Sequence, residues 1–245
     1  MKVFEESRLA LPLVQIAGVI DWAEADLLTA AGADYLGFPL RLTVNKEDLT
    51  EAEAAEIIRG LEARRTAAGG QGPRGVLITY LSKADEIIRF CSELGAGIVQ
   101  LHGPIATDEL RELRRRAPEL VVLKSLVIRA GNEEALRRLV GETVEFVDAY
   151  ITDTFNPATG QEGATGLTHD WSISRRLVEL SPRPVVLAGG LRAENVAEAI
   201  RVVRPAGVDS HTGVEAADGR KDPGMVQAFV ANARAAFAAI AAEGE

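Results

Sequence analysis

Residues 185–214 read VVLAGGLRAENVAEAIRVVRPAGVDSHTGV, and this stretch decides the fold. An apolar run at 185–187 is followed by the pair Gly189–Gly190, and a second short run at 207–209 is followed by the turn Thr212–Gly213. A helical pattern separates the two runs. Short strands of mostly apolar residues are typical of a parallel sheet that is buried on both faces. The stretch therefore predicts two parallel strands joined by a helix, each with a glycine-containing turn at its carboxyl end.

The same alternation of short apolar runs and amphipathic segments extends back to the N-terminus. We expect strands at 13–16, 35–38, 76–80, 97–101, 121–124, 148–151, 185–187 and 207–209, and helices at 21–31, 50–65, 85–94, 107–116, 133–140, 170–180, 193–202 and 223–241. Eight such units in 245 residues predict a single closed (β/α)8 barrel over residues 1–245, with residues 1–10 as an N-terminal extension. An open doubly wound sheet is the competing fold. That fold usually carries a GxGxxG turn after its first strand, and this sequence has none there.

Composition and charge disfavour several classes of protein. The chain is 47% hydrophobic and 26% charged, which is typical of a globular protein with a core. Its formal net charge of −9 argues against nucleic-acid binding. The single cysteine, Cys91, excludes an internal disulfide, and its place on a predicted helix indicates buried packing. Because we find neither a signal-peptide core nor a run of about 20 apolar residues, we expect a cytoplasmic protein without membrane contact.

The functional site is expected at the carboxyl ends of the strands, where barrel enzymes carry their catalytic residues. Polar residues at these predicted ends include Gln100, His102, Lys124, Asp153 and His211. Backbone N–H groups at glycine-rich turns bind anions, so two such turns on neighbouring units predict a phosphate pocket. A carboxylate and a histidine beside that pocket are groups that general acid–base chemistry uses.

Motifs along most of the chain resemble the phosphoribosylanthranilate isomerase family, a group of (β/α)8 enzymes of tryptophan biosynthesis. The resemblance runs from about Leu13 to Phe229 and includes GADYLGF at 32–38, VQLHG at 99–103, Asp153-Thr154, GATG at 163–166, HDW at 169–171, LAGGL at 187–191, VDSHTGVE at 208–215, and Gly219 with Lys221-Asp222. It implies an Amadori rearrangement, in which an aminoaldose phosphate opens its ring and becomes an aminoketose. An acid protonates the ring oxygen, and a base removes the proton from C2.

Three departures from the family pattern concern the site. The base of the family is a cysteine at the end of the first strand, where this chain has Ala17. The family arginine that holds the anthranilate carboxylate falls near Lys46, with Arg41 as a rival position. The turn after the last strand contains His211, where the family has a serine-rich turn. The family's acid, at the end of the sixth strand, corresponds to Asp153.

These assignments give a complete predicted site. Its catalytic residues are Asp153 as the acid and His211, or an unplaced group, as the base; its substrate contacts are Lys46, Gln100, His102 and Lys124; and its phosphate contacts are Gly163, Thr165, Gly166, Gly189, Gly190, Thr212 and Gly213. We expect no cofactor. We also expect no metal, because a His-x-Asp pair is missing from the second strand. The expected ligand is a phosphorylated sugar or sugar amine, and the expected assembly is a monomer or a homodimer.

Two other functions compete with the isomerase. One is a barrel that binds a sugar phosphate without catalysis. The other is a related epimerase or aldolase in which Lys124 forms a Schiff base, which requires a desolvated neutral amine. An ion pair of Lys124 with Asp153 or Asp209 is the structural alternative for that lysine.

Overall fold

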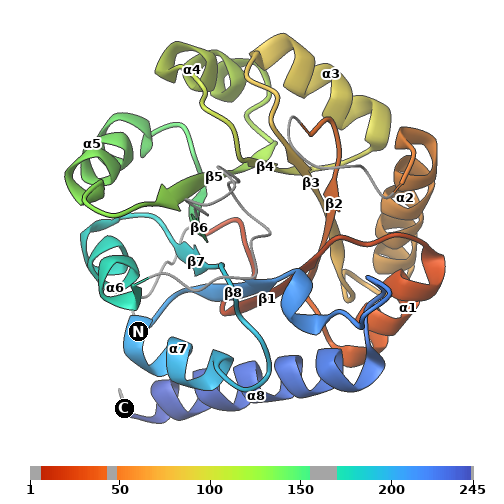
Figure 1. Cartoon of the computed structure of the whole chain (residues 1–245). Helices are drawn as coiled ribbons and strands as arrows, with labels where there is room; N and C mark the ends of the chain where they lie inside the picture. Colours follow the sequence, from red (N-terminus) through yellow and green to blue (C-terminus); the bar gives the residue numbers. More distant parts are fainter. Residues whose placement is uncertain (1–6, 43–48, 155–169, 244–245) are drawn as a thin grey trace.

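Eight parallel strands close into a barrel inside a ring of helices (Figure 1). The structure, a computed structural model, describes residues 7–42, 49–154 and 170–243. The strands are β1 (Leu13–Ala17), β2 (Tyr35–Pro39), β3 (Arg74–Thr79), β4 (Ile98–Leu101), β5 (Val121–Ile128), β6 (Ala149–Thr154), β7 (Val185–Leu187) and β8 (Gly207–Ser210). They follow one another in sequence order, and β1 pairs with β8 to close the ring. The predicted (β/α)8 barrel is confirmed, and the open sheet is excluded.

Four of the described helices begin directly after a residue whose side chain caps the first turn. They are α1 (Trp22–Ala31), α2 (Glu51–Ala67), α3 (Ala84–Leu94), α4 (Thr107–Arg116), α5 (Glu133–Thr143), α6 (Trp171–Leu180), α7 (Val196–Val203) and α8 (Pro223–Ala242), with a short 3-10 turn, η1 (Thr212–Val214), after β8. Asp21 caps α1, and Thr50 forms a reciprocal capping box with Glu53 at the start of α2. These side chains satisfy backbone N–H groups that have no partner within the helix.

Two groups of buried apolar side chains stabilise the barrel. The larger group lies between the strands and the helices. The smaller group fills the barrel interior, and Leu9 and Leu11 of the N-terminal segment pack against it. Inward-facing positions alternate along each strand, so Leu13, Gln15 and Ala17 of β1 share the interior face. This alternation places polar side chains inside the barrel toward its carboxyl end.

Several element boundaries differ from the prediction by a few residues, and two of these differences, in β5 and α7, bear on the site. β5 continues to Ile128, because its second half pairs with β6 through residues such as Val127 and Asp153. α7 begins at Val196 instead of 193, because Asn195 holds the preceding loop in a turn. Its side chain accepts from the N–H of Arg192 and donates to the carbonyl of Gly190. Both differences shape the carboxyl end of the barrel.

α8 is an exception to the expectation that the chain has no run of about 20 apolar residues. By length and composition alone this helix is long and apolar enough to cross a membrane. One face of this outer helix, which includes Phe229 and Phe237, is buried. Figure 1 shows the helix in the outer ring, where it contacts α7 and α1. Its apolar character is therefore accounted for by packing. Cys91 on α3 is buried as predicted, and burial raises the pKa of its thiol to about 12.

Candidate active site

Asp153 lies near the end of β6 and is 4% exposed. One carboxylate oxygen, Oδ1, accepts the backbone N–H of Thr154 at 2.8 Å. The other, Oδ2, lies 2.9 Å from Nδ1 of His102, which follows β4. The angles of this contact are not those of a hydrogen bond, so Oδ2 has no hydrogen-bond donor among the described residues. A buried polar atom without a partner is unusual and is a frequent sign of a functional site.

A chain of side chains connects Asp153 to the far side of the barrel. Gln15 Nε2 donates to Gln100 Oε1 at 2.8 Å, and Gln100 Nε2 lies 2.5 Å from His102 Nε2. Since the amide oxygen of Gln100 is the acceptor for Gln15, its amide nitrogen is the donor to His102. Nε2 of His102 therefore accepts, and its proton is on Nδ1, which faces Asp153. This assignment of the tautomer follows from the hydrogen bonds.

Asp209 lies at the other end of this chain. It belongs to β8, opposite Gln15 of β1, and is 8% exposed. Its Oδ1 is buried without a hydrogen-bond partner among the described residues. Burial raises the pKa of Asp209 to about 7, and the charge of Asp153 adds to the rise. A hydrogen bond from Gln15 and the charges of His102 and Lys221 oppose it. We name the series Asp209, Gln15, Gln100, His102 and Asp153 the carboxylate arc.

His211 covers the end of β1. A Cβ on Gly18 would overlap Nε2 of this imidazole, so the ring lies directly over the glycine. Nε2 is 3.3 Å from Oε1 of Glu215, and the same oxygen is 2.6 Å from Nζ of Lys221. Burial, followed by the charges of Lys221 and His102, lowers the pKa of His211 to about 3. The ring is therefore neutral near neutral pH and is a weak base there.

Ala17 occupies the end of β1 and is 4% exposed. Its methyl group contacts β2, because a Cβ on Gly37 would come within 3.1 Å of it. A methyl group accepts no proton. Asp209, on the adjacent strand β8, is the carboxyl group of the arc nearest to Ala17 in the order of strands around the barrel.

The glycine turns after β7 and β8 come together as predicted. A Cβ on Gly213 would overlap the carbonyl oxygen of Leu191, and Ser210 Oγ donates to that same oxygen at 2.8 Å. Gly189 and Gly190 both have positive φ, at 106° and 61°. Neither of their N–H groups bonds to another described residue. The arrangement leaves donors for an anion at the carboxyl end of the barrel.

Several predicted contacts lie elsewhere or outside the described residues. Lys124 on β5 is 4% exposed, and its ammonium donates to the carbonyls of Leu101 and Ser125 at 3.2 and 3.0 Å. Arg41 pairs with Glu51 at 2.8 Å and stacks on Phe90, so its guanidinium is already engaged. Lys46, Gly163, Thr165 and Gly166 lie outside the described residues. No three Asp, Glu, His or Cys side chains in the described part of the chain form a metal-binding group.

Comparison with known proteins identifies the family. The family model of N-(5'-phosphoribosyl)anthranilate isomerase matches residues 14–232. The chain belongs to this isomerase family. A member from Methanosarcina mazei is 38% identical over 225 residues, covering 91% of this chain and 95% of the relative. A member from Methanothrix thermoacetophila is 34% identical over 221 residues, covering 90% of this chain and 97% of the relative.

Solved structures of the family superpose on this barrel. Phosphoribosyl anthranilate isomerase from Thermotoga maritima has a TM-score of 0.74 and 30% identity, covering 91% of this chain and 98% of its own. A family structure in complex with reduced 1-(o-carboxyphenylamino)-1-deoxyribulose 5-phosphate has a TM-score of 0.72 and 28% identity, with the same coverage. Members of the family catalyse an Amadori-type isomerisation of a phosphoribosyl substrate.

Sequence reasoning missed the place of Asp209 in the site. It treated this residue only as a partner for Lys124, whose ammonium instead bonds to backbone carbonyls. The signal was present in the alternation of β8, where Gly207 and Asp209 occupy the same face of the strand. The links through Gln15 depend on how the strands are staggered around the barrel, which the sequence does not state.

Proposed function

We propose that this chain isomerises N-(5'-phosphoribosyl)anthranilate to the corresponding 1-amino-2-ketose phosphate in the cytoplasm, with a base other than the family cysteine. The carboxylate arc is the observation that carries this proposal. It supplies two buried carboxyl groups, Asp153 on β6 and Asp209 on β8, which are two strands apart around the barrel. Pairs of titratable groups in different environments are the usual basis of acid and base roles in one site.

Asp153 is the acid. Its proton passes to the ring oxygen of the substrate, the bond from C1 to that oxygen breaks, and the nitrogen lone pair forms the C1–N double bond of an iminium. Oδ2 suits this role because it accepts no hydrogen bond from the described residues, while Nδ1 of His102 lies 2.9 Å away. As Asp153 becomes an anion, the N–H of His102 stabilises the charge that develops.

Asp209 is the base. It takes the proton from C2, the electrons of that bond form a C1–C2 double bond, and the C1–N electrons return to nitrogen as an enolamine. The hydroxyl at C2 then loses a proton and C1 gains one, which gives the ketone. A pKa raised to about 7 fits this task, because a general base works best when its pKa is near the operating pH.

His211 is the alternative base, and its environment disfavours it. Burial lowers the pKa of His211 to about 3, so its neutral ring attracts a proton far more weakly than the carboxylate of Asp209. We propose instead that His211 closes the end of β1 over Gly18 and contacts the ligand as a neutral donor or acceptor.

The phosphate group of the substrate is held by the turns after β7 and β8. Two observations support this assignment: the N–H groups of Gly189 and Gly190 bond to no other described residue, and Gly213 lies against the carbonyl of Leu191. We retain Thr212 as a further phosphate contact, with Gly163, Thr165 and Gly166 as predicted contacts from the preceding loop. Gln100 and His102 position the acid.

Lys46 and Lys124 remain predicted contacts to the rest of the substrate. The ammonium of Lys124 donates to two backbone carbonyls, those of Leu101 and Ser125, and hydrogen bonds to a charged group favour its charged form. This disfavours Schiff-base chemistry at that residue.

The test exchanges one base for the other. Asp209→Asn should lower kcat by about 10²- to 10⁴-fold, the range that general base catalysis contributes. Adding Ala17→Cys to that variant restores the family base and should recover activity, whereas Ala17→Ser, of nearly the same size, should not. Full activity of Asp209→Asn would overturn the role of Asp209. Binding of the substrate by the unmodified protein without turnover or C2 deuterium exchange would show a non-catalytic barrel.

A further inference from the structure

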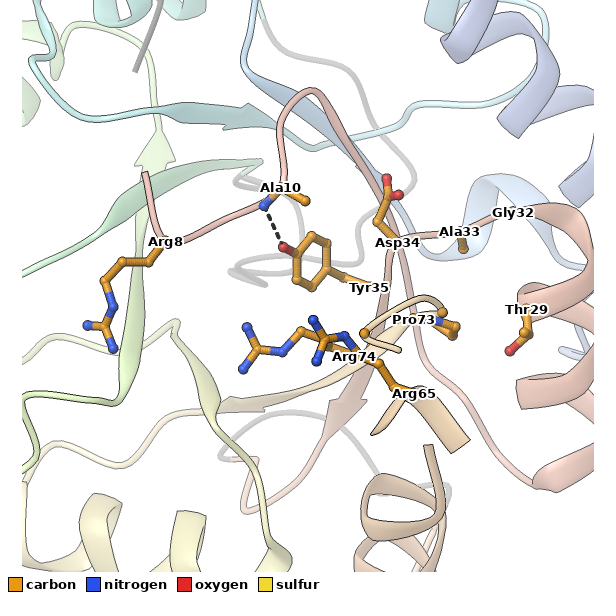
Figure 2. A pocket seen from close by; sticks show the side chains of 12 residues that line it. Arg8, Ala10, Thr29, Gly32, Ala33, Asp34, Tyr35, Arg65, Pro73 and Arg74 are labelled. Carbon is orange, nitrogen blue, oxygen red and sulfur yellow. Dashed lines mark hydrogen bonds between the residues drawn. The ribbon is translucent and has the colours of Figure 1, made fainter. Parts of the chain in front are cut away.

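A cavity lies at the end of the barrel opposite to the carboxylate arc. Its volume is about 350 Å³, within the size range of pockets for small ligands. The walls come from the segment before β1, the ends of α1 and α2, and the first residues of β2 and β3 (Figure 2). Tyr35 and Arg74 are paired in the register of these two strands. The amino ends of the strands form this face, so the cavity is separate from the proposed active site.

Positive charge dominates the walls of this cavity. Arg8, Arg65 and Arg74 line it, and Asp34 is the single acidic residue among the lining residues. Asp34 is already engaged, because its Oδ2 accepts from the N–H of Val14 at 2.7 Å and from Arg234 at 2.6 Å. The cavity therefore gathers cationic side chains that its own carboxylate does not neutralise.

The three arginines differ in how many of their guanidinium N–H donors already have a hydrogen-bond partner. Arg8 donates to the carbonyls of Pro118 and Leu120 and is 3.4 Å from a carboxylate oxygen of Asp148. Arg65 has one long contact, 3.4 Å to Glu62 on its own helix. The backbone N–H of Arg74 donates to the carbonyl of Asp34 at 3.0 Å, but its guanidinium donates no hydrogen bond to any described residue. Two guanidinium groups with spare donors thus line the same space.

Tyr35 adds a further donor between these arginines. Its hydroxyl oxygen accepts the N–H of Ala10 at 2.9 Å. Burial raises the pKa of Tyr35, against the opposing charges of Arg74 and Arg65. The phenol therefore keeps its proton, which can be donated to a ligand. Figure 2 shows the Tyr35 ring beside Arg65 and Arg74, with Arg8 on the far side of the cavity.

We propose that this cavity is a binding site for a small phosphate-type dianion, such as pyrophosphate or a phosphate monoester. Planar guanidinium groups bind two phosphate oxygens at once, and Arg65, Arg74 and the Tyr35 hydroxyl provide donors from two sides. The anion would neutralise the repulsion between the arginines at the floor of the barrel. This proposal is independent of the isomerase reaction.

Calorimetric titration with inorganic pyrophosphate tests it. The wild-type protein should bind at two sites, one at the glycine turns and one in the arginine cavity. Arg74→Met should lose one site, or weaken it about 10-fold or more, as removal of a charge-assisted hydrogen bond does. Arg74→Met should leave kcat and KM of the isomerase unchanged. Gly213→Ala should weaken the other site instead.

Two further variants keep the result decisive. Arg65→Met, on an exposed helix end, repeats the test if Arg74→Met folds poorly. Arg64→Met is the matched control, because Arg64 is the neighbouring arginine on α2 and pairs with Asp26 instead of lining the cavity. The proposal is wrong if pyrophosphate binds at one site only, or if Arg65→Met and Arg74→Met bind it as the wild type does.

Discussion

Nδ1 of His102 faces Oδ2 of Asp153 at 2.9 Å, and Gln100 determines that the proton of the imidazole is on Nδ1. The geometry orients the carboxyl group without neutralising it by a full hydrogen bond. The orientation of Asp153 therefore depends on a residue that follows a different strand. His102, in turn, is oriented by the side-chain amide of Gln100.

Replacing His102 by Gln should separate catalysis from binding. We expect kcat to fall by about 10- to 100-fold, because a misplaced catalytic group costs rate without removing it. KM should change little, since the phosphate turns are untouched. Steady-state kinetics measure this difference. Asp153→Asn is the reference variant, and its kcat should fall by about 10²- to 10⁴-fold. An unchanged kcat with a raised KM would show that His102 only binds the substrate.

Asp209 should make the stability of the protein dependent on pH. Its folded pKa of about 7 lies above the ordinary value of 3.8, so the folded state binds more protons between these values. The free energy of unfolding therefore falls as the pH rises from about 4 to 7 and stays reduced above it. Asp209→Asn removes this loss and should be more stable by about 1–4 kcal/mol at pH 8, with little difference near pH 3. Urea unfolding at the two pH values would detect it; equal shifts at both would contradict the raised pKa.

Gly213→Ala should weaken phosphate binding. The added methyl group would overlap the carbonyl oxygen of Leu191, which is backbone and cannot rotate away. The two turns must then separate, and we expect KM to rise about 10-fold, roughly the loss of one good hydrogen bond to a charged group. Competition by inorganic phosphate measures the same loss directly. Gly141→Ala, in open space on α5, is the control and should leave KM unchanged.

Gly18→Ala should destabilise the barrel through two separable effects. Gly18 has a φ of 79°, which L residues adopt at a cost, and its new methyl group would overlap the ring of His211. We expect a loss of about 2–4 kcal/mol in the free energy of unfolding. In the His211→Ser background only the backbone cost remains, about 1 kcal/mol. An identical loss in both backgrounds would mean that the imidazole does not lie over Gly18.

The sequence predicted the barrel well because short apolar strands, capping residues and glycine turns are local signals. Thr50 with Glu53 and the turn at Gly189–Gly190 are examples that the structure confirms. Asp153 was predicted at a strand end for the same reason, and the structure places it near the end of β6. The carboxylate arc was not, because contacts between Gln15, Gln100 and Asp209 depend on strand stagger. The arginine cavity was missed because Arg8, from the segment before β1, joins Arg65 and Arg74 only in the folded barrel.

The carboxylate arc also has a consequence for the charge of the site during turnover. In the proposed reaction Asp153 gives up one proton and Asp209 takes up one, so the protonation states of the two carboxyl groups are exchanged. One negative charge therefore moves from the β8 side of the barrel to the β6 side while the total stays constant. The phosphate held at the glycine turns meets the same net charge in the substrate complex and in the enolamine. Such a site needs no movement of counterions between the two chemical steps, and its pH profile belongs to the pair rather than to either carboxyl group.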